Sequence, residues 1–597
     1  MPSPIEDYAL LSDCRTGALV SREGSIDWMC LPRFDSPSLF GALLGDPVNG
    51  RWSLRPRGQA TVIDRRYVAD TFILVTRWQT ETGVAEVHEM LALHRHRTDL
   101  VRRVVGVTGT VEFETEVRLH FDYSRTLPWV RQVGTPDAPA LRATAGPEAV
   151  VLTGVALAAS GHAHVGTFGV AAGAQRDLVL TRFPSYERPP EPLDVEEAFA
   201  ATRSWWQGWA SGIADHDAHD DQVVRSLLVL RALTNRDTGG IVAAATTSLP
   251  EEFGGSRNWD YRFVWLRDAS LTLEVLITHG YLEEAHHWRR WLLRAIAGEP
   301  REVQIMYGIA GERDLPEREL SSLPGYEGAQ PVRIGNAAVA QYQGDVIGEV
   351  LVALEQARIA GLEESDFSWP LQRALIGRVL EDLDRKDNGI WEIRGEPQWF
   401  THSRVMMWAA LDRGVRAVRE HGLSGDADRW EQARDALRRE IDERGVDPDA
   451  GCFVQHYDST EVDASLLVLP QVGYCPADDP RMLRTVQRME ETLLRDGLLL
   501  RYRTGSGVDG LPGDEHPFLA CSFWLVEQYA ASGRTADAHA LMERLTALPN
   551  EVGLLSEEYD VSRGRQAGNT PQALSHLTLI RAADALAGHS GRAAHRR

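Results

Sequence analysis

Cysteine is scarce in this chain, and its spacing excludes several kinds of site. The five cysteines are widely scattered, and no two of them form a Cys-x-x-Cys pair, so neither a zinc knuckle nor a thioredoxin-like redox motif is expected. No stretch approaches the roughly 18 apolar residues of a membrane-spanning helix. Gly-rich phosphate loops and the Gly-x-Ser-x-Gly elbow are also missing, which excludes two further families of catalytic sites.

Positive charge is in deficit. The chain has 63 basic against 86 acidic residues, a formal net charge of −23, whereas nucleic-acid binding needs clustered positive charge. Residues 1–7 lack the basic start and the apolar core of a signal peptide. These features predict a cytoplasmic protein with reduced thiols that binds neither nucleic acid nor membrane.

A length of 597 residues exceeds one ordinary core, so we expect two or more domains. Residues 1–190 alternate apolar and polar positions, most clearly at 71–78, 100–107 and 111–119, with Gly, Pro and Asp between the runs. This pattern is typical of an antiparallel β-sandwich. The proline-rich segment 184–192 then indicates a linker.

Residues 191–219 are interpreted as that linker together with a tryptophan-rich helix. The helix is predicted over 195–212, where the spacing of Trp205, Trp206 and Trp209 brings indoles to one face. The indoles could line a sugar site, but docking of two domains against each other is the favoured interpretation.

Residues 220–597 change to helix after helix. Apolar residues recur at helical spacing, and long Gly- and Pro-rich connections at 299–335 and 499–516 separate some of the helices. Alternating short and long connections favour a closed ring of helix pairs with a site at one end over a helical solenoid, because no fixed sequence period is visible. The predicted helices span 221–235, 264–279, 282–297, 337–360, 370–385, 403–421, 427–443, 480–494, 517–532, 535–546 and 571–587.

Two carboxylates beside aromatic residues carry the chemical hypothesis. Glu392 follows a turn signal and adjoins Trp391; an aromatic wall would raise its pKa and keep it protonated, as a general acid requires. Glu557 and Glu558 are adjacent, so only one of them can easily face a given ligand, where it could activate water as a general base. The alternatives are a surface glutamate beside a packed indole and a solvated acidic pair.

A third segment, 258–268, packs aromatic residues among charges and ends in Arg267-Asp268. The guanidinium N–H donors of Arg267 and the two carboxylate oxygens of Asp268 suit binding of sugar hydroxyls. An ion pair between these two side chains without a ligand is an equal alternative. Aromatic faces that stack on sugar rings, together with paired carboxylates, point to glycosidic bond cleavage. No metal or other cofactor is predicted: His94 with His96, and His216 with His219, lack further ligands at suitable spacing.

Six sequence blocks occur in an order that resembles glycoside hydrolase family 15, the glucoamylase family, in its bacterial and archaeal branch that includes trehalases. The resemblance covers nearly the whole chain and implies an N-terminal β-sandwich followed by a six-fold α/α barrel. The blocks are 24–37, 257–268, 325–336, 391–395, 556–560 and 568–573.

The resemblance also implies roles for the residues above. Glu392 would be the general acid and Glu557 the general base of an inverting hydrolysis that releases β-glucose from a non-reducing end. Such enzymes hold their two carboxyl groups roughly 6.5–9.5 Å apart, which leaves room for water. Arg267 and Asp268 would hold the terminal glucose.

Aromatic contacts are implied as well: Trp265 and Trp391 would border the glucose ring, with Arg333 as a further contact. Ile393 stands where fungal glucoamylases carry a second acidic residue, and no starch-binding appendage is visible. We therefore expect a small α-glucoside as the substrate, with trehalose, maltose-type and isomaltose-type sugars all open. The rival hypotheses are a disaccharide phosphorylase and a non-catalytic sugar-binding protein; homo-oligomerisation is possible.

Overall fold

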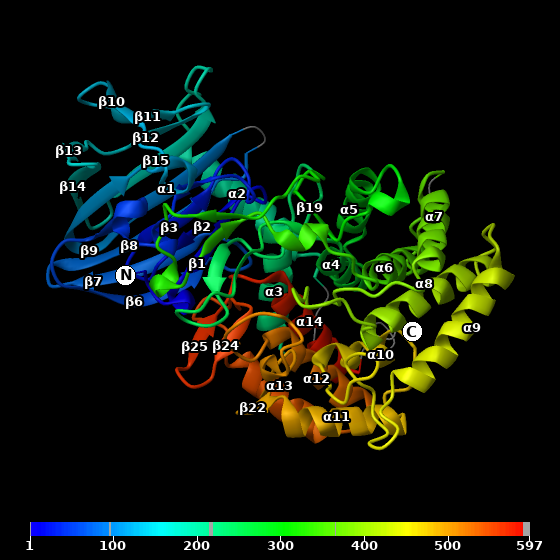
Figure 1. Ribbon diagram of the computed structural model, residues 1–597. Helices are drawn as coiled ribbons and strands as arrows, with labels where there is room; N and C mark the ends of the chain where they lie inside the picture. The colour runs from blue at the N-terminus through cyan, green and yellow to red at the C-terminus, as the bar shows by residue number, and fades with distance from the viewer. Residues whose placement is uncertain (1, 95–96, 214–218, 365, 589–597) are drawn as a thin grey trace.

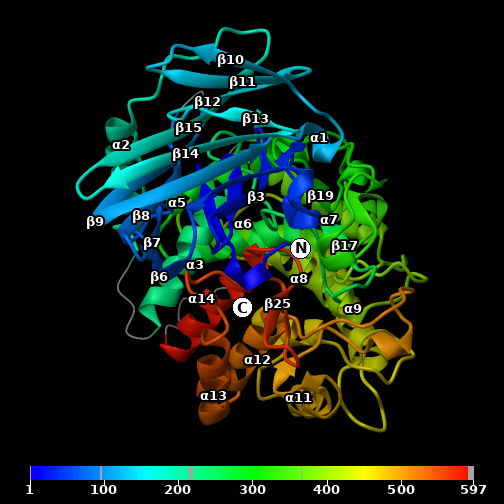
Figure 2. The same ribbon diagram turned by 90° about the vertical axis from the view of Figure 1, so that its left-hand side faces the viewer.

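The computed structural model describes all residues except 1, 95–96, 214–218, 365 and 589–597. A large antiparallel sheet region, blue to cyan in Figure 1, stands beside a helical region that runs from green to red. Figure 2 shows the same sheet region turned toward the viewer. The predicted order, β-rich first and helical second, is confirmed.

The sheet region follows the strand path β1-β2-β3-β5-β9-β15-β12-β11-β10, with the other strands of this region paired beside that path. Every strand pairing among its described residues is antiparallel, as between β8 and β9 and between β15 and β9. The strands are β1 (Ala9–Ser12), β2 (Gly17–Val20), β3 (Ser25–Cys30), β4 (Ser38–Phe40), β5 (Arg51–Pro56), β6 (Ala60–Tyr67), β7 (Leu74–Thr80), β8 (Gly83–Leu91), β9 (Thr98–Arg118), β10 (Trp129–Gly134), β11 (Pro139–Ala145), β12 (Glu148–Thr153), β13 (Ala158–Ser160), β14 (Ala163–Ala171) and β15 (Gln175–Pro184).

Strand β9 joins two parts of the sheet that the sequence pattern had separated. The runs at 100–107 and 111–119 were predicted as two strands, but β9 is continuous over 21 residues. Its first half pairs with β8 and β15, and its second half pairs with β5 and β14. The change occurs at Gly109, where φ is 63° and an added Cβ would lie 2.0 Å from the Thr82 carbonyl oxygen. Glycine is therefore required at this bend.

The tryptophan-rich helix α2 (Val195–Ala210) contacts both regions. Trp206 is fully buried and lies 5.0 Å from the Phe72 ring of the sheet region. Trp209 stacks on Tyr281 of the helical region at 4.3 Å and donates a 2.7 Å hydrogen bond to Glu284. The docking interpretation of these indoles is confirmed.

Helices of the rest of the chain form an inner and an outer set. The inner set comprises α4 (Leu266–Thr278), α6 (Val346–Ile359), α8 (Thr401–Arg419), the short α10 (Val468–Gln471), α12 (Leu519–Ala531) and α14 (Ala573–Leu586). The outer set comprises α3 (Asp220–Leu233), α5 (Leu282–Ala295), α7 (Ser368–Glu381), α9 (Ala427–Arg444), α11 (Pro480–Thr492) and α13 (Thr535–Thr546).

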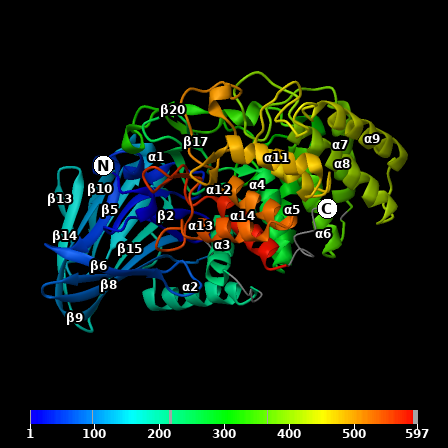
Figure 3. The ribbon, with the colours of Figure 1, turned by 90° about the horizontal axis from the view of Figure 1, so that it is seen from below.

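The inner helices close into a ring. Contacts run from α4 to α6, α6 to α8, α8 to α10, through the adjoining 3-10 turn Ala464–Leu467 to α12, then to α14 and back to α4. Most of these helices are buried on nearly every side, as α12 shows, whereas outer helices such as α11 keep a polar face. Figure 3 shows this assembly from below. The expected α/α ring is thereby present.

One helix prediction was wrong in part, and one helix was missed. The helix expected over 337–360 begins only at Val346, because residues 337–340 form a 3-10 turn and an irregular stretch follows. Helix α10 was missed, since four residues ending beside Pro470 are too short to show a helical period. Within the described residues, no helix is long and apolar enough to cross a bilayer.

The sheet region supports the helical region from behind the segment 258–265. Arg262 and Asp260 form a fully buried ion pair at 2.6 Å. The Arg262 guanidinium also donates to the Ser36 carbonyl oxygen at 2.9 Å and to the Tyr123 hydroxyl at 3.0 Å, both in the sheet region. Because these donors are satisfied only when both regions are in place, the loop that follows β16 (Thr247–Pro250) is held in one position.

Candidate active site

A cavity opens where the connections preceding the inner helices meet. Its walls combine aromatic rings with charged groups. The lining residues are Ala243, Glu251, Arg257, Trp259, Tyr261, Trp265, Arg267, Asp268, Asn336, Ala338, Ile390, Trp391, Glu392, Arg394, Arg501, Tyr502, Leu511, Phe518, Gln572 and Leu574.

Glu392 projects into this cavity from a strained turn. Its φ is 58°, a conformation that side-chain-bearing residues seldom adopt. Two hydrogen bonds hold the turn: Glu392 N–H donates to the Gly389 carbonyl oxygen, and Ile393 N–H donates to that of Asn388, both at 3.1 Å. The Glu392 carboxylate accepts a 2.6 Å hydrogen bond from the Trp265 indole. Glu392 is thus a fixed carboxyl within a pocket rather than a surface residue.

Burial raises the pKa of Glu392. Arg267, whose Nη2 lies 3.7 Å from Glu392 Oε1, opposes that rise, as does the Trp265 indole, whereas Asp268 adds to it. The net upward direction favours the protonated carboxyl, which is the form a proton donor requires.

Arg267 and Asp268 lie in the first turn of α4. Arg267 Nη2 is 3.1 Å from Asp268 Oδ2, and Nη1 donates to the Ile390 carbonyl oxygen at 2.8 Å. The guanidinium thereby ties α4 to the turn that carries Glu392. Both side chains line the cavity, so the ion pair and the ligand-holding interpretation are compatible.

Trp391 and Trp265 form part of the same wall. Trp391 Nε1 donates to Asp463 at 3.2 Å, and its ring lies 6.0 Å from that of Phe518. Trp265 packs edge-on against Tyr261 at 5.4 Å. With their polar atoms already bonded to protein groups, these rings offer apolar surface to a ligand.

Glu557 is fully buried behind the cavity wall rather than on it. Its Oε2 accepts a hydrogen bond from Asn569 N–H at 3.3 Å. Gly568 leaves the room for this carboxyl: its φ is 74°, and an added Cβ would lie 2.5 Å from Glu557 Oε2. The conformation and the close approach both require glycine, which gives a physical reason for the 568–573 block.

Tyr261 interacts with both carboxyl groups. Both Glu557 and Glu392 raise the pKa of its hydroxyl, after burial as the main cause, and the hydroxyl also interacts with the Glu557 carboxyl. Because Tyr261 lines the cavity, a ligand that reaches Tyr261 is close to both acids. Burial, reinforced by Glu251, raises the pKa of Glu557 to about 8, while Arg501, Tyr261 and Asn569 N–H oppose the rise.

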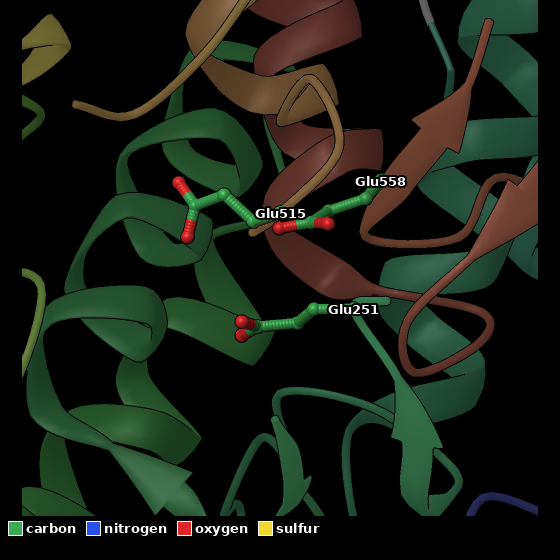
Figure 4. A group of neighbouring side chains, drawn as sticks. All are labelled: Glu251, Glu515 and Glu558. Atoms are coloured by element: carbon green, nitrogen blue, oxygen red, sulfur yellow. The ribbon is translucent and has the colours of Figure 1, made fainter. Parts of the chain in front are cut away.

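Three further buried carboxyls, Glu251, Glu515 and Glu558, form a cluster (Figure 4). Arg501 Nη2 lies 3.0 Å from Glu251, 2.6 Å from Glu515 and 3.6 Å from Glu558. The three carboxylates are close enough to share a cation, but a guanidinium already occupies that place. We therefore interpret the group as a buried arginine site rather than a metal site. The Glu558 carboxylate faces Arg501, whereas the Glu557 carboxylate faces Asn569, so the two adjacent side chains diverge as predicted. Both are buried, so the alternative of a solvated acidic pair does not apply.

Residues 217–584 match glycosyl hydrolases family 15. The chain belongs to that family. Its residues 1–172 also match a trehalase-like N-terminal domain. Membership of family 15 makes this protein a glycoside hydrolase, as the sequence blocks implied.

Relatives of this family 15 hydrolase extend along nearly its whole length. A trehalase of Mycolicibacterium smegmatis is 38% identical over 97% of this chain and 90% of its own. A trehalase of Thermoplasma volcanium is 32% identical over 98% of this chain and 93% of its own. A bacterial glucoamylase complexed with acarbose superimposes with a TM-score of 0.76, covering 98% of this chain and 95% of its own at 12% identity. The last comparison shows a shared fold of sheet domain and α/α barrel.

Arg333, which was predicted to contact the substrate, does not line the cavity of this family 15 enzyme. Its guanidinium lies 4.7 Å from the Trp259 ring and donates to the Ser256 and Asn258 carbonyl oxygens. Arg333 therefore supports Trp259 from behind. The histidine hypotheses go untested in part, because His96 and His216 lie outside the described residues.

Sequence reasoning missed several lining residues of the cavity. Trp259 and Tyr261 lie in the aromatic run that had been singled out, so their types were a usable signal. Arg501 and Tyr502 lie in the long connection 499–516, and Glu251 follows β16. For these three, no local pattern indicates a site, because only the ring closure brings them together.

Proposed function

We propose that this family 15 enzyme hydrolyses α,α-trehalose, or a closely similar small α-glucoside, and releases β-glucose by an inverting, exo-acting mechanism. The observation that carries the proposal is that Glu392 and the buried Glu557 both interact with Tyr261, a residue that lines the same cavity as Glu392. The trehalase relatives, which span the whole chain, select trehalose among the open substrates.

Glu392 is the proposed general acid. Its raised pKa keeps a proton available for the glycosidic oxygen, and the Trp265 hydrogen bond fixes the carboxyl for that transfer. When the bond breaks, the leaving glucose takes this proton and Glu392 is left ionised. Arg267 at 3.7 Å then stabilises the new negative charge.

Glu557 is the proposed general base, which removes a proton from water as the water attacks the anomeric carbon. Burial and Glu251 raise its pKa to about 8, while Arg501, the Tyr261 hydroxyl and Asn569 N–H oppose the rise, so the ionised form that a base requires increases as pH rises toward 8. Attack from the face opposite the leaving group produces β-glucose from an α-glucoside. Arg267 and Asp268 would bind the hydroxyls of the reacting ring, with Trp265 and Trp391 along its apolar face.

Three features complete the proposal. The partner is a small carbohydrate, the enzyme works in the cytoplasm, and its subunits form a homo-oligomer. We place the sheet domain at residues 1–190, the linker with its tryptophan-rich helix at 191–219, and the catalytic domain at 220–597.

The deciding experiment is a proton NMR time course of the purified protein with trehalose and, separately, with maltotriose. Inverting cleavage of trehalose gives β- and α-glucose in equal early amounts, because the leaving ring keeps its α configuration. Retaining cleavage would give α-glucose alone and would overturn the roles of Glu392 and Glu557. Turnover only with phosphate, yielding glucose 1-phosphate, would identify a phosphorylase instead; binding without any turnover would identify a sugar-binding protein.

A further inference from the structure

The charged side chains that line the cavity differ in exposure, and Arg394 is the most exposed of them. The exposed fraction is 5% for Asp268 and 11% for Arg267, then 19% for Glu392 and 30% for Arg394. The cavity therefore opens at the Arg394 end. A glucose ring bound by Arg267 and Asp268 would be at the closed end, so the leaving group would extend past Glu392 toward Arg394.

Arg394 crosses this open end. Its guanidinium forms a two-pronged ion pair with Glu317, with distances of 3.1 Å from Nη1 and 2.6 Å from Nη2. The same guanidinium lies 4.2 Å from the centre of the Trp259 ring. Arg394 N–H donates to the Asp509 carbonyl oxygen at 2.9 Å. One residue thus connects four segments that come from four different helix connections.

The partners of Arg394 are themselves held in place. Glu317 accepts a hydrogen bond from Ala337 N–H at 3.1 Å and lies 3.4 Å from Arg333. The Asp509 carboxylate pairs with Arg257 at 2.5 Å and accepts from the Tyr502 hydroxyl at 3.1 Å. An ion pair supported at both ends loses less entropy on forming than an isolated surface pair.

Close backbone contacts fix the segment that carries Arg394. A Cβ added to Gly395 would lie 2.4 Å from the Val508 carbonyl oxygen, and a Cβ added to Gly510 would lie 2.9 Å from the Gly395 Cα. The turn that carries Glu392 and the connection 499–516 therefore touch backbone to backbone. No side chain has to move aside for this closure, because two glycines meet there.

We propose that the Arg394–Glu317 bridge is the outer wall of the leaving-group site and limits the substrate to two sugar rings. This inference rests on the proposed function, since it concerns which glucosides enter. Arg394 and Glu392 line the same cavity, so in this proposal the leaving ring fills the space between the acid and the bridge. A third ring would have to displace Arg394 from both Glu317 and Trp259, so longer chains bind less well than disaccharides.

The test compares binding of maltose and maltopentaose by titration calorimetry. All proteins carry Glu392→Gln, so that no sugar is consumed and binding is read without turnover. With the bridge intact, maltopentaose should bind about tenfold or more weakly than maltose, about 1.4 kcal/mol. Adding Arg394→Ala should reduce this ratio to about one. The matched control is Arg182→Ala, which removes a similar two-pronged pair with Glu148 in the sheet region and should leave the ratio unchanged.

Glu317→Gln breaks the bridge from the other side and carries the test if Arg394→Ala does not fold. The proposal is overturned if maltopentaose already binds as well as maltose to the protein with an intact bridge, or if neither substitution changes the ratio. Failure of the proposed function would look different: the wild-type protein would release no glucose in the NMR time course, whatever the binding ratio.

Discussion

Replacing Trp265 by phenylalanine tests how the proposed general acid is tuned. The Trp265 indole donates a 2.6 Å hydrogen bond to Glu392 Oε1 and packs edge-on against Tyr261. Phenylalanine keeps an aromatic ring in this buried position but has no N–H to donate. The substitution therefore removes one contact of Glu392 and leaves Arg267 in place on the same oxygen.

The expected effect follows from the strength of that contact. A hydrogen bond to a charged group is worth about 1.5–3 kcal/mol, and one pKa unit corresponds to about 1.4 kcal/mol. The loss would raise the pKa of Glu392 by about one to two units if the indole stabilised the ionised form alone. A protonated carboxyl can still accept at its carbonyl oxygen, so we expect the lower end, about one unit.

The assay is the pH dependence of kcat/KM for trehalose in wild type and Trp265→Phe. The limb of the pH profile that belongs to Glu392 is identified with Glu392→Gln on α-glucosyl fluoride, which this variant can still cleave because fluoride leaves without a proton. The limb that is missing from that profile is the one due to Glu392. In Trp265→Phe this limb should move to higher pH by about one unit. Trp291→Phe is the control: its indole donates to the Ile309 carbonyl oxygen, so both limbs should stay. A Glu392 limb that stays, or moves to lower pH, would refute the reasoning.

Three further predictions concern the two acids and their surroundings. Glu392→Gln should lower kcat on trehalose by about 10²–10⁴-fold but much less on α-glucosyl fluoride, whereas Glu557→Gln should impair both; equal losses for Glu392→Gln would contradict its role. Gly568→Ala should lower kcat/KM on trehalose more than about tenfold, because its methyl group meets Glu557 Oε2 at 2.5 Å; Gly564→Ala, also at positive φ but with its nearest neighbour at 3.8 Å, should retain activity. Asp345 is buried with neither carboxylate oxygen hydrogen-bonded, and burial raises its pKa to about 8, so folding loses stability as pH rises from about 4 to about 8. Asp345→Asn should therefore raise Tm relative to wild type, with a difference that grows from pH 5 to pH 8; a constant difference would argue against an un-ionised Asp345.

Periodic segments were predictable from sequence, whereas contacts between distant segments were not. The helices α5, α9 and α13 begin or end within two residues of their predicted bounds, because each presents an uninterrupted apolar stripe. Strand β9 was divided in two since Gly109 interrupts the alternation, yet a glycine at positive φ is what allows the strand to continue.

Within the site, the sequence located the residues that sit in recognisable blocks. Glu392 adjoins Trp391, and Arg267 lies two residues after Trp265 in a dense aromatic run, so type and spacing were informative. Arg501 and Glu251 lie outside the recognisable blocks, and their importance arises from a 3.0 Å contact between segments 250 residues apart along the chain (501 minus 251). Burial of Glu557 was likewise invisible in sequence, because a pair of adjacent glutamates suggests solvent.

The closure of the inner ring has a consequence for synthesis of the protein. Helix α14, near the C-terminus, packs against α3 and α4 at the start of the helical region, and Glu557 with its partner Asn569 lies just before it. A nascent chain still lacking this last part would contain Glu392 and Arg267, but it would lack the proposed general base and its ring would be open. If the proposed roles hold, translation must be nearly complete before any glycosidic bond is cut, and a product truncated before Glu557 should be inert.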